Sequence, residues 1–175
     1  FCKILNCKLF VTQSTDPTII KMYKEKLGCK VVGIPSGGLD EEIFFPGPLR
    51  ERRKIDIGFR AFDEPFYFGH QERRKFMDAA RVESRKLNLT TDFSMDTEDR
   101  YTGLDWGDFL RNCKSTIGSS SGFDYFELND KLRKEVNEYC NSRSHVTFQE
   151  VERNIFSKKQ NKARMRLISG RIIEA

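Results

Sequence analysis

Hydrophobic and polar residues along the first 35 positions predict a strand, a helix and a second strand. The apolar runs at residues 8–12 and 30–34 are typical of short buried strands. The segment between them repeats with helical spacing, and its apolar face carries Ile20, Tyr23 and Leu27. Residues suited to its two ends are Thr15 or Asp16 as the cap, Pro17 in the first turn and Gly28 as the stop. This order is the unit from which parallel sheets are built.

The middle of the chain continues the alternation. Residues 55–59 predict a strand, and residues 72–87 predict a helix whose inward residues are Phe76, Ala80 and Leu87. Thr90 to Phe93 is a further short strand, and the acidic stretch from Asp92 to Asp108 suggests a loop. A helix capped by Asp105 is expected next, with an apolar stripe of Trp106, Phe109, Leu110 and Cys113.

The last third predicts two more helices and two short strands. Residues 115–117 form one strand and residues 166–168 the other. One helix starts at Asn129 or Asp130 and carries Leu132, Val136 and Tyr139, and the other follows a capping box from Thr147 to Glu150. The alternation predicts an α/β fold with helices flanking a parallel sheet.

Composition narrows the class of protein without deciding it. The 175 residues carry a net charge of +5 and five scattered cysteines, and the absence of a CxxC pair together with only two histidines argues against a zinc site. The odd cysteine count favours a reducing compartment, and no apolar run approaches the roughly 18 residues of a membrane span. The chain opens at Phe1-Cys2-Lys3 and stops at Ala175 as an apolar element begins, so we expect a fragment that is incomplete at both ends.

One candidate binding element is the small-residue loop Gly118-Ser119-Ser120-Ser121-Gly122, which follows an expected strand. Such a loop lets backbone N–H groups face a ligand, and three hydroxyls add donors, so a phosphate or sugar is a candidate occupant. The loop lacks the Gly-Lys-Ser/Thr ending of a Walker A motif. A flexible serine turn is the alternative interpretation.

Cations near two expected element ends are the other candidates. Arg60 ends the strand at 55–59, where ligands gather in open α/β sheets, and Arg73, Arg74 and Lys75 open the helix that follows His70. Cations at that position could hold a diphosphate through charge-assisted contacts. A salt bridge at Arg60 and a solvated helix face at the cluster are the competing interpretations.

Nucleic-acid binding is less favoured. The basic runs 50–54 and 158–166 lack interleaved aromatic residues, and neither lies on a recognisable binding module. Nucleophilic catalysis also has little support, since Cys113 lies on an apolar stripe and His70 has no partner that spacing supplies.

The segment from Val11 to Pro46 resembles the crossing between the two halves of GT-B glycosyltransferases, which use nucleotide sugars. The matching features are Ser14 after a strand, Ile34-Pro35 and Gly37 after the next, then Asp40, Phe44 and Pro46. Ser36 stands where those enzymes usually have Asn. The resemblance implies an end of the N-terminal domain and a crossing at 1–46, a linker at 47–54, and a Rossmann-like donor-binding domain at 55–175.

The remainder resembles that donor-binding half, most closely a bacterial polysaccharide-type group. Gly69 with Arg73, Arg74 and Lys75 is similar to the diphosphate-holding segment. Ser121-Gly122-Phe123-Asp124 stands where many relatives carry Glu-Gly-Phe-Gly at the sugar-contacting loop, so the usual first Glu is missing. The ending Glu174-Ala175 is similar to the Glu-Ala whose carboxylate binds the donor ribose.

The resemblance implies a metal-independent glycosyltransferase in surface polysaccharide synthesis, with no cofactor beyond its nucleotide-sugar substrate and a glycan or lipid-linked acceptor. The expected donor-binding residues are Arg60, Arg73, Arg74, Lys75, Gly118, Ser119, Ser120, Ser121, Gly122 and Glu174, and the catalytic residues stay unassigned. A cytoplasmic location is expected, with contact at the inner face of the membrane left open. The alternative is a non-catalytic sugar- or nucleotide-binding module of the same fold.

Overall fold

The computed structural model describes residues 4, 6–35, 37–159 and 163–174. Phe1, Cys2, Lys3, Ser36 and Ala175, which entered the sequence analysis, lie outside them, as does part of the basic run 158–166. The chain is an α/β protein with small parallel sheets, as its alternating pattern predicts. Contacts divide it into two compact units. The first comprises Phe1–Ser36, Pro65–His70 and Ser120–Ile168, and the second comprises Gly37–Glu64, Gln71–Ser119 and Ser169–Ala175.

The first unit begins with the expected strand, helix and strand. Strand β1 (Leu9–Thr12) pairs in parallel with β2 (Lys30–Gly33), and α1 (Pro17–Leu27) connects them. The Asp16 carboxylate accepts hydrogen bonds from the N–H groups of Thr18 and Ile19, and Gly28 ends the helix in the left-handed conformation, which confirms both helix signals. The fully buried residue of α1 is Ile19, which the expected face omitted.

The rest of the first unit is a strand pair and a helical excursion between its strands. Strand β6 (Ser121–Phe123) pairs with β7 (Met165–Leu167), and the pairing is antiparallel, so the predicted last strand does not extend a parallel sheet. Between them lie α4 (Lys131–Asn141), α5 (Phe148–Asn154) and the 3-10 turn Phe156–Lys158. The capping box from Thr147 to Glu150 is confirmed.

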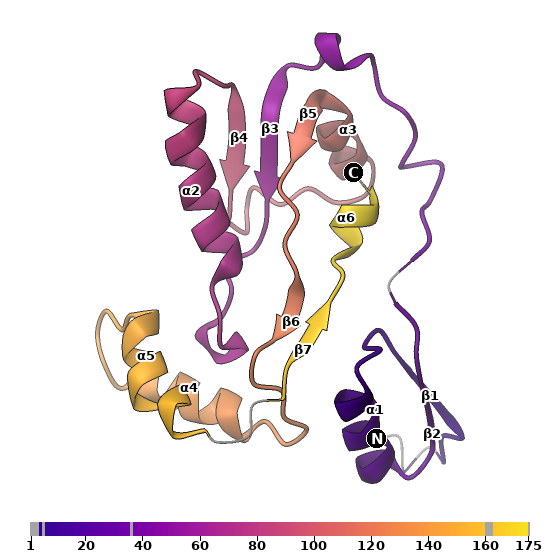
Figure 1. The fold of residues 1–175 in the computed structure, drawn as a ribbon, viewed down its shortest axis with the longest axis vertical. Coiled ribbons are helices and arrows are strands. Elements are labelled where there is room, and N and C mark those ends of the chain that lie inside the picture. The colour runs from indigo at the N-terminus through magenta and orange to yellow at the C-terminus, as the bar shows by residue number, and fades with distance from the viewer. Residues whose placement is uncertain (1–3, 5, 36, 160–162, 175) are drawn as a thin grey trace. The chain divides into compact units, whose positions relative to one another are not determined.

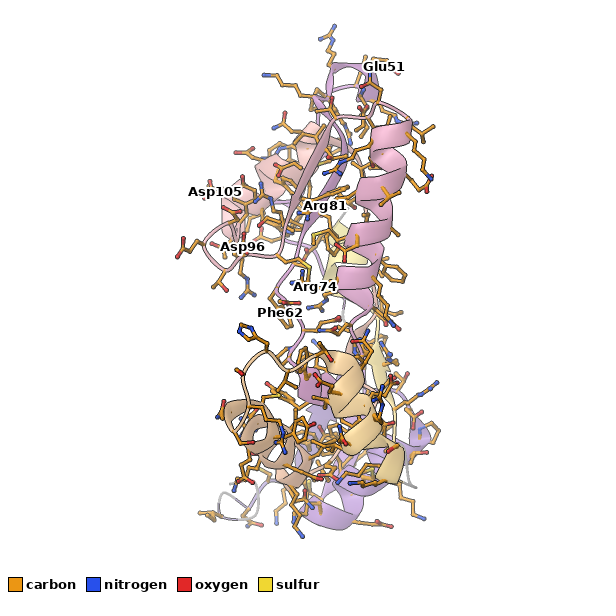
Figure 2. The ribbon with its side chains drawn as sticks, turned by 90° about the vertical axis from the view of Figure 1, so that its left-hand side faces the viewer. Glu51, Phe62, Arg74, Arg81, Asp96 and Asp105 are labelled. Carbon is orange, nitrogen blue, oxygen red and sulfur yellow. The ribbon has the colours of Figure 1, made fainter. Side chains whose placement is uncertain are left out.

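The second unit is built on a parallel sheet with the strand order β4-β3-β5. The central strand is β3 (Ile55–Arg60), and its neighbours are β4 (Thr91–Ser94) and β5 (Cys113–Thr116). The connecting helices α2 (Glu72–Lys86) and α3 (Gly103–Asn112) lie on opposite faces of this sheet (Figures 1 and 2). The unit ends with the short helix α6 (Gly170–Glu174).

Several expected details of this unit are wrong. Helix α3 begins within the stretch expected to be a loop, its N-cap is Thr102 rather than Asp105, and Cys113 starts β5 instead of continuing the helix. The acidic residues misled the prediction because Asp105 lies in the first turn, where a negative charge also suits the helix dipole. The predicted stripe itself is largely confirmed, since Phe109, Leu110 and Cys113 are buried together.

The apolar face of α2 also differs from the expectation. Phe76 and Leu87 are 43% and 67% exposed, whereas Met77 is 2% exposed and packs with Phe59 and Met95. The buried residues Met77 and Ser84 are two turns apart, so a methionine and a serine define the packed face. A search for large apolar residues therefore selected the solvent side.

The segment expected to be a linker packs against α3. A Cβ atom at Gly47 would lie 2.9 Å from the Cβ of Arg111, and Phe44 contacts the cluster formed by Phe109, Leu110 and Cys113. The compact units therefore have other bounds than the expected domains 1–46, 47–54 and 55–175. That domain division comes from the family resemblance and stays a prediction.

The corrected face of α2 gives a stability test. Met77→Ala should lower the free energy of unfolding by about 2–5 kcal/mol, because it opens a cavity in a packed cluster. Phe76→Ala should change it by less than about 1 kcal/mol, because that ring faces solvent. Urea unfolding of the two variants measures both values, and equal losses would contradict the orientation of α2.

Candidate functional site

Arg60, at the end of β3, is held by the second unit's own acidic residues. Its guanidinium pairs with Asp92 on the neighbouring strand and lies 3.4 Å from a carboxylate oxygen of Asp99. The same group stands 4.9 Å from the ring centre of Tyr101. Only 12% of the side chain is exposed. The salt-bridge interpretation of Arg60 therefore describes its environment.

A buried carboxylate occupies the amino end of α2. Glu64 is 3% exposed, and its Oε2 accepts a hydrogen bond of 3.1 Å from the backbone N–H of Arg73. Its Oε1 lies 3.6 Å from Nε of Arg73, whose guanidinium covers the ring of Phe62 at 4.2 Å. Burial lowers the pKa of Arg73, and the charge of Glu64 opposes that shift. An internal anion thus stands at the helix end where the sequence predicted a diphosphate.

The other two cations of the predicted cluster have different surroundings. Arg74 binds both carboxylate oxygens of Asp63, at 3.2 and 2.5 Å, and this pairing raises the pKa of Arg74. Figure 2 shows Arg74 and Phe62 near the end of α2 at which the helix begins. Lys75 is exposed. Of the three consecutive cations, Arg73 is therefore mostly buried, Arg74 is paired at the surface and Lys75 is exposed.

The predicted serine loop is divided between the two units. Gly118 and Ser119 belong to the second unit, where a Cβ at Gly118 would lie 3.0 Å from the Ile172 side chain. Ser120, Ser121 and Gly122 belong to the first unit, and the last two are part of β6 rather than a loop. The flexible-turn interpretation therefore fails for those two residues.

In the first unit, Ser120 belongs to a polar network around a buried aspartate. Nη1 of Arg166 donates to the Ser120 hydroxyl at 2.9 Å, and its Nε and Nη2 donate to one oxygen of Asp124 at 2.9 and 2.6 Å. Nε2 of the buried His70 lies 3.1 Å from the carbonyl oxygen of Gly122. These contacts tie β6, β7 and the turn at Phe66–Phe68 together.

Among the predicted site residues, Glu174 combines a fixed carboxylate with a place in the lining of a cavity. Its Oε2 accepts a hydrogen bond of 2.8 Å from the indole N–H of Trp106 on α3. The side chain lines a cavity of about 240 Å³ in the second unit. A half-buried carboxylate with one oxygen fixed by an indole can accept further hydrogen bonds from vicinal hydroxyl groups.

Two arginines line the same cavity, and sequence reasoning did not select either. Nη1 of Arg53 donates to the carbonyl oxygen of Cys113 at 2.9 Å, and Nη1 of Arg111 donates to that of Ile43 at 2.7 Å. Arg111 also pairs with Asp108 and covers the ring of Phe45 at 3.9 Å. For Arg53 the signal was the basic run 50–54, which was considered only as a nucleic-acid contact and as part of a linker, whereas Arg111 lies on α3 outside any basic run.

Within the described residues, no cluster of three or more His, Cys, Asp or Glu side chains is arranged to hold a metal ion. None of the described helices combines the length and apolar character required to cross a bilayer.

Comparisons with protein-family models, with curated proteins and with solved structures gave no match.

The buried ion pair at α2 predicts an uneven response to truncation. Arg73→Ala should destabilise the protein by about 3–5 kcal/mol, because it leaves the Glu64 carboxylate buried without its cation. Arg74→Ala should cost less than about 1 kcal/mol, and Lys75→Ala is the matched control. Urea unfolding decides between this pattern and a uniform one, and adding Glu64→Gln to Arg73→Ala should restore part of the loss.

Cys113 predicts a stability change at alkaline pH. Burial raises the pKa of this thiol from 9.0 to about 11. The folded state therefore keeps a proton that the unfolded state loses, so this contribution is present below pH 9 and is lost as the pH rises towards 11. Two pKa units correspond to about 3 kcal/mol. The free energy of unfolding should fall more steeply from pH 8.5 to 11 than in Cys113→Ala, and parallel curves would contradict the assignment.

Proposed function

We propose that this chain carries the donor-binding part of a glycosyltransferase that uses a nucleotide sugar. The strand order β4-β3-β5 supports a Rossmann-like domain, because the chain adds one parallel strand on one side of β3 and the next on its other side, as in doubly wound sheets that bind nucleotides. The GT-B resemblance of residues 11–46 and of the segment ending at Glu174 supplies the activity. The sugar is transferred to a glycan or lipid-linked acceptor in surface polysaccharide synthesis, at the cytoplasmic side of the membrane.

The observation that carries the proposal is the position of Glu174 beside Trp106, Arg53 and Arg111. The carboxylate accepts hydrogen bonds from the ribose hydroxyls, which is the role that the resemblance implies. The two guanidinium groups bind phosphate oxygens and stabilise the charge that develops on the leaving diphosphate. This arrangement moves the main cationic contact of the donor from the Arg73–Lys75 cluster to Arg53, and Arg111, which also pairs with Asp108, is the secondary contact.

A specific observation favours the alternative of a non-catalytic binding module. Arg60, Arg73 and Arg74, three of the four cations first expected at the diphosphate, are paired with acidic residues of this chain, and Arg111 in the cavity pairs with Asp108. A protein that binds the nucleotide sugar but neither transfers nor hydrolyses it would fit that arrangement. Release of the free sugar from radiolabelled donors, with and without total glycan extract as acceptor, separates the two candidates.

Nucleotide binding tests the proposed site. UDP, GDP, ADP and CMP are titrated into the full chain by calorimetry, and the melting temperature is followed in parallel, since a native-state ligand at 100 times its Kd stabilises by about 2.7 kcal/mol. Glu174→Ala should weaken the preferred nucleotide at least about tenfold, because it removes charge-assisted hydrogen bonds worth roughly 1.5–3 kcal/mol.

Matched controls separate the site from general effects of charge. Glu98→Ala removes an exposed carboxylate, and Arg85→Ala removes an exposed guanidinium on α2, so neither should change the nucleotide Kd. Arg53→Ala, like Glu174→Ala, should weaken binding of the preferred nucleotide. Unchanged affinity in both site variants, in a protein that does bind a nucleotide, would overturn the assignment.

A further inference from the structure

A second cavity, of about 260 Å³, lies entirely within the first unit, and half of the residues that line it are aromatic. The rings belong to Tyr67, Phe123, Tyr125 and Phe126. Each of them is only partly buried. Partly exposed rings around a concavity differ from core rings, because a ligand can reach their exposed part.

Contacts behind the cavity fix these rings in place. Tyr125 stacks on the buried Phe156, with ring centres 4.6 Å apart and planes 9° from parallel. The ring centre of Phe123 lies 4.5 Å from that of Phe68, and the ring centre of Phe126 lies 5.6 Å from that of Tyr23 on α1. Because packing restricts the rings before any ligand arrives, less conformational entropy is lost on binding.

The backbone around the rings is also held. The N–H of Asp124 donates to the carbonyl oxygen of Phe68 at 2.8 Å, and Arg166 binds the Asp124 carboxylate. Gly69 has φ +78°, and a Cβ there would lie 2.5 Å from the Tyr125 ring, so glycine permits this close approach. The cavity wall is therefore a rigid part of the unit.

Charged side chains line the cavity beside the rings and are partly balanced. Oε2 of Glu127 accepts a hydrogen bond of 3.0 Å from the N–H of Leu132 at the start of α4. The Asp130 carboxylate pairs with Nη2 of Arg133 at 2.8 Å. Carboxylates that accept and a guanidinium that donates thus stand together, with one excess negative charge among the three side chains.

We infer that this cavity binds one neutral sugar ring. A pyranose presents C–H groups on its faces, which stack on aromatic rings through their electron-rich faces, and its hydroxyl groups both donate and accept hydrogen bonds. The volume of about 260 Å³ lies just below the roughly 300–1,000 Å³ of drug-sized ligand pockets, which suits a ligand of one sugar ring. The excess negative charge disfavours phosphorylated and acidic ligands. This inference concerns a separate site and does not depend on nucleotide binding.

The experiment uses methyl glycosides of glucose, galactose, mannose and N-acetylglucosamine as probes for the full chain. Saturation-transfer NMR detects binding, and titration gives the Kd. At least one glycoside should bind, with the strongest transfer from the protons on a single face of the ring. Tetramethylammonium is the competing probe, because aromatic rings with excess negative charge also suit a cation.

Variants locate the bound glycoside. Phe126→Leu keeps an apolar side chain but removes the ring, and it should weaken the glycoside at least about tenfold. Asp130→Asn changes an exposed residue with φ +57°, a conformation that Asn also tolerates, and it should weaken binding about threefold without lowering the melting temperature. This second variant tests the site even where Phe126→Leu fails to fold.

Controls separate this site from the proposed nucleotide site and from general destabilisation. Phe59→Leu alters a buried ring of the second unit, and Arg153→Gln alters an exposed arginine on α5, so both should leave the glycoside Kd unchanged. Glu174→Ala should also leave it unchanged. The inference is overturned by the absence of transfer from all four glycosides, by binding that survives Phe126→Leu and Asp130→Asn, or by binding of tetramethylammonium alone.

Discussion

The apolar face of α3 is the constraint on which the second unit depends. Phe109 and Leu110 pack with Cys113 at the start of β5, and Phe44, Ile55 and Trp106 contact the same cluster. One helix thus joins the extended segment before β3, the central strand and the indole that holds Glu174. Because interiors are close-packed, a change of volume in this cluster reaches the cavity as well as the sheet. The contacts that stabilise the second unit therefore also position the residues of the candidate donor site.

The carboxylate of Glu64 occupies the amino end of α2, where the sequence predicted the diphosphate of a ligand. The amino end of α2 offers N–H groups and the positive end of a helix dipole, and the buried carboxylate satisfies both. Arg73 then compensates the buried charge instead of facing solvent. A cation motif at a helix start is therefore informative about ligands only once the nearby acidic residues are placed. Here the cations beside Glu174 are the better candidates because they line a cavity.

Local signals in the sequence were sufficient for most elements. Asp16, Gly28 and the Thr147–Glu150 box act through groups within four residues, so their roles could be deduced directly. Long-range pairing could not be deduced in this way. The antiparallel partner of β6 is more than forty residues away, and the residues that line the Glu174 cavity come from segments separated by more than a hundred positions. The packed face of α2 was also missed, because Met77 and Ser84 are less conspicuous than Phe76 and Leu87.

The pairing of β6 with β7 has a consequence for how this chain can change in evolution. The polypeptide leaves the pair after Phe123 and returns at Met165, so the two ends of the helical excursion are neighbours. The excursion has its own apolar cluster, which includes Leu132, Val136, Val151 and Phe156. A segment whose ends meet and whose buried core lies within it, apart from packing with Phe66 and Tyr67, can change in length while the strands that anchor it keep their register. The helices α4 and α5 are therefore the part of this protein in which related chains can differ most in length.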